Sequence, residues 1–281
     1  MIDALPEANF ISVQIGAMNF RAFVIGSGKP VLLLHGFPDD LSVWRKVIPG
    51  LVDAGYQVIA FDQRGCGESD APHGAKHYTI RKIVDDIPLI LAAFDLRGKV
   101  AVIGHDWGSV IGWAFALWYP ERVAALVAIS VGHPQSYGRA GIEQKLGRGF
   151  YTLWFQLSGF AEWHLLRRKG QALRAWMRHH ENASEAVLRM SRPGRLSAAL
   201  NWYRANLIGI VFDRWPHCRV PTLGVWSDRD ALLTEAQMQN SSAFVSADWR
   251  YERVDHCGHW IPLDAPDKLV ALAVAWFRKY A

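Results

Sequence analysis

An aspartate between two glycines stands where the sequence could present a nucleophile. The apolar run at residues 100–103 leads into Gly104-His105-Asp106-Trp107-Gly108, and a segment of helical pattern follows. This order of strand, tight turn and helix is the form of a nucleophile elbow, whose flanking residues must be small because the helix approaches the strand closely. Asp is also a common N-cap, so the pattern by itself leaves open whether Asp106 attacks a substrate or only caps a helix.

A base and an acid follow in the chain order that such an elbow requires, with the nucleophile first, the acid second and the histidine last. His259 precedes the final helical segment and is the predicted general base, with His256 as the nearest alternative. Asp228 and Asp230 both follow the apolar run at residues 222–226. We predict that Asp230 orients His259, because it lies deeper in the loop, and we keep Asp228 as the alternative.

Backbone donors for a developing negative charge are predicted on both sides of the aspartate. His35-Gly36-Phe37-Pro38 follows the apolar run at residues 31–34, and a loop in this place can turn the N–H of Phe37 toward the nucleophile. With the N–H of Trp107 it would form an oxyanion hole. An aspartate suits attack on an sp3 carbon, because the ester that forms has a carbonyl that water can hydrolyse. Serine would form an ether, which offers no such route.

Short β-branched runs alternate with longer segments of helical period along most of the chain, a pattern typical of a parallel sheet covered by helices. The predicted fold class is therefore α/β. Residues 10–15 and 19–25 are separated by Gly16 and resemble a hairpin that leads into the sheet. Buried strands are predicted at residues 31–34, 57–61, 100–103, 123–129, 222–226 and 249–254, and helices at residues 42–54, 79–94, 108–119, 234–246 and 264–280.

The alternation stops after Ser130, and residues 132–215 are helical, aromatic and basic without a convincing strand. We predict a core formed by residues 1–131 and 216–281. A helical cap, or lid, formed by residues 132–215 is predicted to be inserted after the sixth strand. Pro193-Gly194 marks a turn within this cap.

Composition argues against several other classes of protein. The 281 residues carry a formal charge of +5, but the basic residues form no single run, so we expect no nucleic-acid partner. Cys66, Cys218 and Cys257 are widely spaced, which argues against a disulfide framework and a metal site. No apolar run reaches the length of a membrane span, and the N-terminus lacks the pattern of a signal peptide. These features predict a cytoplasmic protein that binds no membrane and could form a homodimer.

The loop, the elbow and the order of the later residues together resemble the epoxide hydrolase branch of the α/β-hydrolase superfamily over essentially the full chain. His35-Gly36-Phe37-Pro38 is similar to that family's H-G-x-P loop, and residues 104–108 are similar to its aspartate elbow. Residues 62–69 resemble a loop found throughout the superfamily, for which a structural role is expected. Gly132-His133-Pro134 does not match the family pattern, so the resemblance does not define the rim of the pocket.

The resemblance implies two cap tyrosines that donate hydrogen bonds to the oxygen of an epoxide ring. Tyr203 lies in Asn201-Trp202-Tyr203-Arg204, which matches the family pattern, and Tyr151 lies in a similar aromatic segment at residues 150–156. Tyrosines in an aromatic lid more often serve packing, and it is the match at both positions that favours this role. No cofactor or metal is implied. His35 is expected to be structural rather than catalytic, and contacts with the substrate are expected from His35, Pro38, Trp154 and Trp260.

The implied function is that of an epoxide hydrolase, which converts a small apolar epoxide and water into a vicinal diol. Asp106 would open the ring and form an ester, and water activated by His259 would hydrolyse this ester. A non-catalytic binding protein on the same fold is one alternative, which a complete catalytic set disfavours.

A dehalogenase that uses the same aspartate is the nearest alternative. A haloacetate enzyme is expected to carry Arg at the position of Trp107, and a haloalkane enzyme Asn or Glu at the position of Phe37. Both positions therefore disfavour dehalogenation, although Trp107 and Trp154 could still line a halide site.

Overall fold

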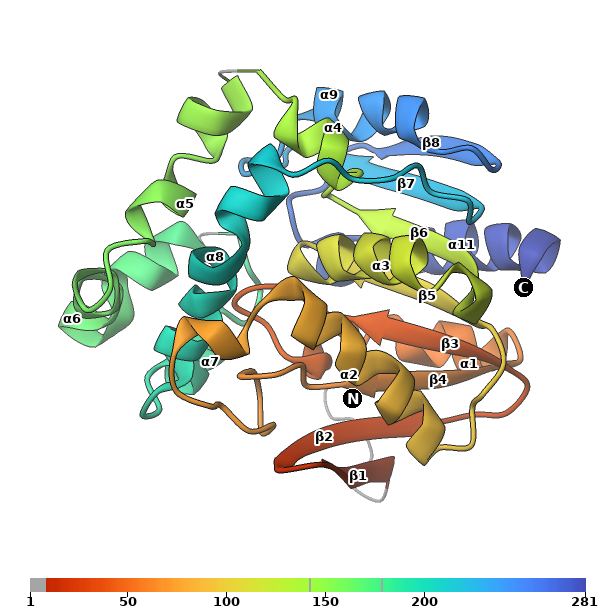
Figure 1. Ribbon diagram of the computed structural model, residues 1–281, viewed down its shortest axis with the longest axis horizontal. Helices are drawn as coiled ribbons and strands as arrows, with labels where there is room; N and C mark the ends of the chain where they lie inside the picture. Colours follow the sequence, from red (N-terminus) through yellow and green to blue (C-terminus); the bar gives the residue numbers. More distant parts are fainter. Residues whose placement is uncertain (1–8, 142, 178) are drawn as a thin grey trace.

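The computed structural model describes residues 9–141, 143–177 and 179–281 and contains an eight-stranded sheet with helices on both faces (Figure 1). The N-terminal residues 1–8, for which we predicted that no signal peptide is present, lie outside the described residues. The strands are β1 (Phe10–Ile15), β2 (Met18–Ile25), β3 (Lys29–Leu34), β4 (Tyr56–Phe61), β5 (Val100–His105), β6 (Val123–Ile129), β7 (Thr222–Ser227) and β8 (Trp249–Val254).

The sheet is mostly parallel, as the alternation of strands and helices predicted. Its strand order is β1-β2-β4-β3-β5-β6-β7-β8. β2 is antiparallel to β1 and β4, and the other neighbouring pairs are parallel. Every residue of β5 and β7 is buried, which explains why these strands, apart from His105, consist of small and apolar residues on both faces. β6 and β8 have the predicted bounds, and β3, β4, β5 and β7 extend one or two residues further than predicted.

Helices cover the two faces of the sheet in pairs. α2 (Ile80–Ala93) and α3 (Trp107–Trp118) lie on the front face in Figure 1, and α1 (Ile48–Asp53) and α11 (Pro266–Tyr280) lie behind it. A short helix, α10 (Ile261–Asp264), precedes α11. α3 packs against β5 and β6 and is buried from Trp107 to Ala116, so it is the most enclosed of the helices that flank the sheet.

Two of the predicted helices are wrong in length. The helix predicted at 42–54 is instead a 3-10 turn, η2 (Leu41–Trp44), followed by α1. Pro49 has no N–H and would clash in the interior of a continuous helix, but it is tolerated in the first turn of α1.

The helix predicted at 234–246 ends early, because α9 (Glu235–Gln239) gives way to the 3-10 turn η6 (Asn240–Phe244). The hydroxyl of Ser241 donates to the carbonyl of Gln237 at 2.9 Å. Asn and Ser side chains compete in this way with helical hydrogen bonds.

The described residues between β6 and β7 form helices and no strand. They comprise α4 (Pro134–Gly138), the π-helical turn η5 (Glu143–Arg148), α5 (Tyr151–Trp154), α6 (Phe160–Trp176), α7 (Ala183–Met190) and α8 (Arg195–Phe212). Figure 1 shows α5 to α8 on the left of the sheet, at the end toward which β3 points. This segment therefore lies beside the carboxyl ends of the parallel strands, where open α/β sheets bind ligands.

His133 joins the two ends of this helical segment. Its Nε2 lies 3.0 Å from the carbonyl oxygen of Pro216, and its Nδ1 accepts from the N–H of Gln135 at 3.1 Å. Burial lowers the pKa of His133 to about 4. The ring is therefore neutral at pH 7, with a proton on Nε2 for the bond to Pro216 and a lone pair on Nδ1 that accepts from Gln135.

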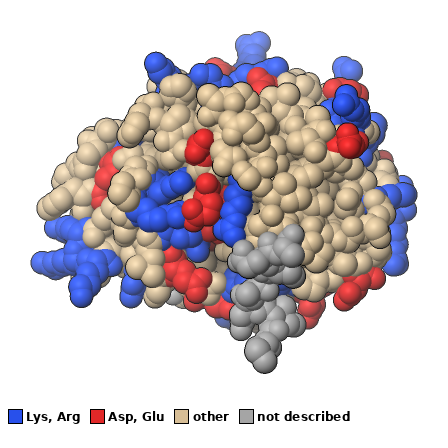
Figure 2. Space-filling model, turned by 90° about the horizontal axis from the view of Figure 1, so that it is seen from below, with Lys and Arg blue, Asp and Glu red and all other residues tan. Residues whose placement is uncertain are grey.

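Other expectations from composition can be compared with the described residues. Cys66, Cys218 and Cys257 are buried and free. In the described ranges, no helix has the length and apolar character that a membrane crossing requires. Figure 2 shows basic side chains interspersed with acidic ones on the face seen from below, rather than in one continuous track.

Gly108→Ala is expected to destabilise the fold strongly. A Cβ at this position would lie 1.9 Å from the carbonyl oxygen of Leu34, so α3 would have to move away from β3. We expect the free energy of unfolding, measured with denaturant, to fall by at least about 2 kcal/mol. Gly98→Ala is the matched control, because a Cβ there has no atom within 4 Å. Equal stabilities of the two variants would contradict this account of the elbow.

Candidate active site

Asp106 lies on a sharp turn between β5 and α3, with φ of 54° and ψ of −120°. A non-glycine residue with positive φ is strained and is typical of a nucleophile elbow. The glycines on both sides are required by space, because a Cβ at Gly104 would lie 2.2 Å from the carbonyl oxygen of Gly108. Asp106 occupies the N-cap position of α3, but its side chain makes no capping hydrogen bond, so capping by the side chain does not account for an aspartate here.

The carboxylate of Asp106 contacts a backbone donor on one oxygen and faces a histidine on the other. The N–H of Phe37 donates to Oδ1 at 2.9 Å, and Oδ2 lies 3.6 Å from Nε2 of His259. Gly36 allows this approach, since a Cβ there would lie 2.5 Å from Oδ1 of Asp106. Trp107 is the first residue of α3, where a helix leaves its N–H groups without helical acceptors. Its predicted role as the second oxyanion donor remains a prediction.

His259 is held by Asp230, the acid that we preferred from the sequence. Nδ1 of His259 lies 2.9 Å from Oδ2 of Asp230, and both side chains are buried. The other oxygen, Oδ1, accepts from the N–H groups of Leu232 and Leu233 at 2.8 and 3.0 Å, which orients the carboxylate. The hydrogen bonds of Asp230 therefore leave its Oδ2 directed at the imidazole.

The two alternatives to this pair lie elsewhere. Asp228 accepts from the N–H of Cys257 at 3.3 Å, and His256 is exposed with its Nδ1 3.1 Å from Arg229. A further histidine, His105, contacts the backbone of His259, because its Nε2 lies 2.9 Å from the carbonyl oxygen of His259.

The electrostatics of His259 depend on its two carboxylate neighbours. Burial by itself lowers the pKa of this histidine, but Asp230 and Asp106 outweigh burial and raise the pKa to about 10. The ring is therefore an imidazolium while both carboxylates are ionised. Nε2 of His259 is buried and has no hydrogen-bond partner among the described residues, and it points toward the carboxylate that would react.

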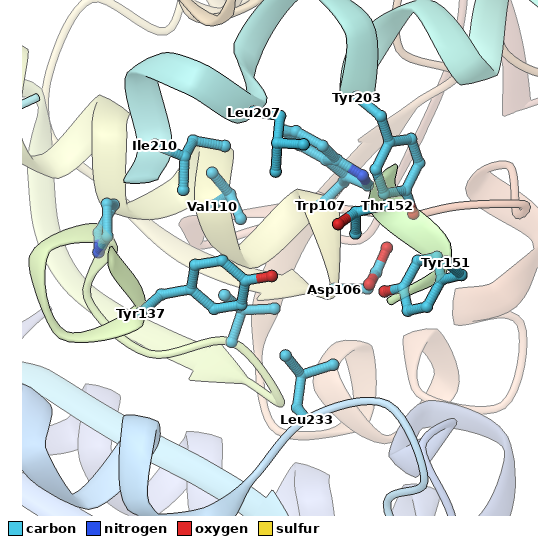
Figure 3. A pocket seen from close by; sticks show the side chains of 12 residues that line it. Asp106, Trp107, Val110, Tyr137, Tyr151, Thr152, Tyr203, Leu207, Ile210 and Leu233 are labelled. Carbon is cyan, nitrogen blue, oxygen red and sulfur yellow. The ribbon is translucent and has the colours of Figure 1, made fainter. Parts of the chain in front are cut away.

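A cavity of about 50 Å³ opens above Asp106. Figure 3 shows Tyr151 from α5 and Tyr203 from α8 with their hydroxyls directed toward the carboxylate of Asp106. Burial and the charge of Asp106 raise the pKa of both tyrosines, so both remain donors at neutral pH. The cavity is lined by Asp106, Trp107, Val110, Val131, Pro134, Tyr137, Tyr151, Thr152, Tyr203, Leu207, Ile210 and Leu233.

The four residues that we expected to contact the substrate are not among those that line this cavity, so their contacts with a substrate remain a prediction. The side chain of His35 is buried below the site, where its Nε2 accepts from the N–H of Gln63 at 3.0 Å. Nε1 of Trp260 donates to Asp39 at 3.0 Å, and Trp154 packs against the ring of His164. Pro38 also lies outside the lining. Aromatic character and a place in a family motif do not determine which way a side chain points.

Sequence reasoning missed three residues near the site. Tyr137 lines the cavity, and Gln144 and Arg148 bind the loop that carries Asp230. A guanidinium nitrogen of Arg148 donates to the carbonyl oxygens of Asp230 and Leu233 at 2.5 and 2.8 Å. The only available signal was their place after the sixth strand, whose carboxyl end borders the site. In the described part of the chain, no group of His, Cys, Asp and Glu could hold a metal ion.

The chain is similar to known epoxide hydrolases in sequence and structure. A family model described as alpha/beta hydrolase fold matches residues 29–266. Epoxide hydrolase 4 of Mus musculus is 30% identical over 96% of this chain and 79% of its own length. Epoxide hydrolase A of Mycobacterium tuberculosis is 30% identical over 89% of this chain and 92% of its own. The crystal structure of Epoxide Hydrolase A from Mycobacterium thermoresistibile superposes with a TM-score of 0.83 at 27% identity, covering 97% of this chain and 98% of that chain.

Asp106→Ala is expected to lower the pKa of His259, because it removes one of the two charges that raise it. Nuclear magnetic resonance of the imidazole signals between pH 6 and 11 would follow the titration. The unchanged protein should hold His259 protonated at pH 8, and the variant should release the proton at lower pH. Asp228→Ala is the control, since this carboxylate hydrogen-bonds to Cys257 and not to His259. Identical His259 titrations in all three proteins would show that the charge of Asp106 does not affect the pKa of His259.

Proposed function

Because the chain belongs to the epoxide hydrolase branch of the α/β-hydrolase superfamily, we propose that it hydrolyses epoxides to vicinal diols through a covalent ester on Asp106. The observation that carries this proposal is one arrangement around the Asp106 carboxylate. Phe37 contacts one oxygen, His259 faces the other, and two tyrosine hydroxyls lie above. Such a set supplies a nucleophile, a base and acids within one enclosed space.

In the first step Tyr151 and Tyr203 donate hydrogen bonds to the ring oxygen of the epoxide. Oδ2 of Asp106 attacks a ring carbon, the bond between that carbon and the ring oxygen breaks, and the oxygen takes a proton from a tyrosine. The raised pKa keeps both tyrosines protonated at neutral pH, so both can donate hydrogen bonds to the ring oxygen. The product of this step is an ester of Asp106 that bears a neighbouring hydroxyl.

Formation of the ester changes the state of His259. Asp106 loses its negative charge, so one cause of the raised pKa of His259 disappears. The imidazolium then gives up its proton more readily and restores the tyrosinate to its neutral form, directly or through water. The same residue can therefore be a cation in the resting site and a base once the ester has formed.

In the second step the neutral imidazole removes a proton from water, and the water oxygen attacks the carbonyl carbon of the ester. The negative charge that develops lies on the oxygen that the N–H of Phe37 already contacts at 2.9 Å. Trp107 would supply the second N–H. Collapse of the intermediate releases the diol and regenerates the carboxylate of Asp106.

We further propose that residues 132–215 act as a cap that must shift to admit the substrate. The cavity volume of about 50 Å³ is far below the roughly 300–1,000 Å³ of ordinary ligand pockets. Five of the lining residues come from α5 and α8, so movement of these helices would enlarge the space.

Dehalogenation by the same aspartate is not favoured by the site. Phe37 contributes its N–H to Asp106 and carries no side-chain group that would hold a halide. Two buried tyrosine hydroxyls above the carboxylate suit an oxygen leaving group better, because it must be protonated as it departs.

The purified protein is expected to convert aryl and alkyl epoxides into diols, as measured by chromatography of the products. Asp106→Ala should reduce kcat/KM by about 10⁴-fold or more, because no ester can form. Asp228→Ala is the matched carboxylate control and should retain turnover. If the folded protein left every epoxide intact but released chloride from haloalkanes or chloroacetate, the dehalogenase alternative would replace the proposal.

His259→Gln is expected to trap the ester, because the first step does not require the base and the second does. Mass spectrometry of the variant after exposure to an epoxide should show an increase equal to the mass of that epoxide, on the peptide that contains Asp106. His256→Gln, which changes the exposed histidine nearby, should accumulate no adduct. An adduct on any other residue would refute Asp106 as the nucleophile.

A further inference from the structure

A third tyrosine faces the cavity, and the proposed mechanism does not use it. Tyr137 belongs to α4, and Figure 3 shows its hydroxyl pointing into the cavity from the side opposite Tyr151 and Tyr203. The surroundings at its end of the cavity are apolar, and they include Val110, Val131, Pro134, Ile210 and Leu233. A single hydroxyl among such residues is the polar group that could select a substrate at this end.

The hydrogen bonds of Gln144 determine which of its amide atoms faces Tyr137. Oε1 of Gln144 accepts from the N–H of Thr234 at 2.7 Å, and Nε2 donates to the carbonyl oxygen of Leu232 at 3.1 Å. A backbone N–H can only donate and a carbonyl oxygen can only accept, so the amide cannot be reversed. Gln144 is buried, with 1% of its surface exposed, so this arrangement is enclosed.

Nε2 of Gln144 and the hydroxyl of Tyr137 both lie beside Gly149. A Cβ placed at Gly149 would lie 3.5 Å from Nε2 of Gln144 and 3.5 Å from the hydroxyl oxygen of Tyr137. The contact with Gln144 by itself acts to lower the pKa of Tyr137, as a donor to the oxygen does. A donor on this side of the oxygen leaves the proton of Tyr137 available to another acceptor.

The hydroxyl of Tyr137 points into the cavity and keeps its proton at neutral pH. Burial and the charge of Asp106 outweigh the contact with Gln144 and raise the pKa of Tyr137 to about 12. A hydrocarbon substituent placed against the hydroxyl would leave this donor unsatisfied, which costs binding free energy. A substituent that carries an acceptor would satisfy it, and a site with a built-in hydrogen-bond donor discriminates in this way between otherwise similar substrates.

We propose that Tyr137 is a specificity-determining residue that donates a hydrogen bond to an oxygen on the substituent of the substrate. The preferred substrates are then epoxides that carry an ether or carbonyl oxygen outside the ring, rather than purely hydrocarbon epoxides. This inference rests on the proposed epoxide hydrolysis and adds the substrate class. Tyr151 and Tyr203 act on the ring oxygen, and Tyr137 acts on the opposite end of the molecule.

Matched substrates test this role without relying on the absolute rate of any variant. The first pair is phenyl glycidyl ether and 1,2-epoxy-4-phenylbutane, in which a methylene replaces the ether oxygen. The second pair is 1,2-epoxy-4-phenoxybutane and 1,2-epoxy-5-phenylpentane. In this ether the oxygen lies one atom further from the epoxide ring than in the first pair. For each pair, the ratio of kcat/KM for the ether to kcat/KM for the hydrocarbon is measured in the unchanged protein and in Tyr137→Phe.

We expect Tyr137→Phe to lower this ratio by roughly 2- to 10-fold for at least one pair, the value of one neutral hydrogen bond. Comparison of the same two substrates in both proteins cancels their different intrinsic reactivities. Tyr251→Phe is the control, because this hydroxyl bonds to Glu235 at 2.7 Å away from the cavity and its loss should leave both ratios unchanged.

Two outcomes would overturn the inference, and they are distinguishable. If the ethers and hydrocarbons are hydrolysed but neither ratio changes in Tyr137→Phe, the tyrosine only packs and the proposed function stands. If the unchanged, folded protein hydrolyses none of the four epoxides, the proposed function fails and the substrate class fails with it.

Discussion

The close approach of α3 to the end of β3 is the constraint on which the rest of the site depends. Gly108 lies against the carbonyl of Leu34, and Gly36 lies against the side chain of Asp106, with no room for a Cβ at either glycine. This contact carries the Asp106 carboxylate to the N–H of Phe37. The positive φ of Asp106 costs on the order of 1–3 kcal/mol, and the burial of α3 along most of its length offsets that strain.

The site also contains buried charged groups, which must be stabilised by hydrogen bonds or by opposite charges. Asp230 is satisfied by two N–H groups and His259, whereas Asp106 is satisfied by one N–H group and faces His259 at a longer distance. The difference matters chemically, because a carboxylate with fewer partners is freer to attack. A carboxylate held on both oxygens is suited to orient the imidazole.

The segment after β6 connects the opposite ends of the site. Within it, Tyr137 lines one end of the cavity, Gln144 and Arg148 bind the loop that carries Asp230, and Tyr151 lies over Asp106. A displacement of this segment would therefore affect the substrate pocket and the acid loop together. In the proposed function, the cap movement that admits the substrate and the alignment of Asp230 would therefore depend on the same few contacts.

The sequence by itself determined the α/β class and placed Asp106 and His259 in their elements, because strand periodicity, glycine spacing and chain order are local signals. Only the tertiary structure decided between Asp230 and Asp228. The choice depends on backbone N–H groups two and three residues further on and on the position of His259 in the loop after β8. The tertiary structure also placed Tyr137 in the cavity and removed the four residues expected to contact the substrate from its lining. The physical reason is that a side chain's direction is determined by neighbours from distant segments, which no local pattern records.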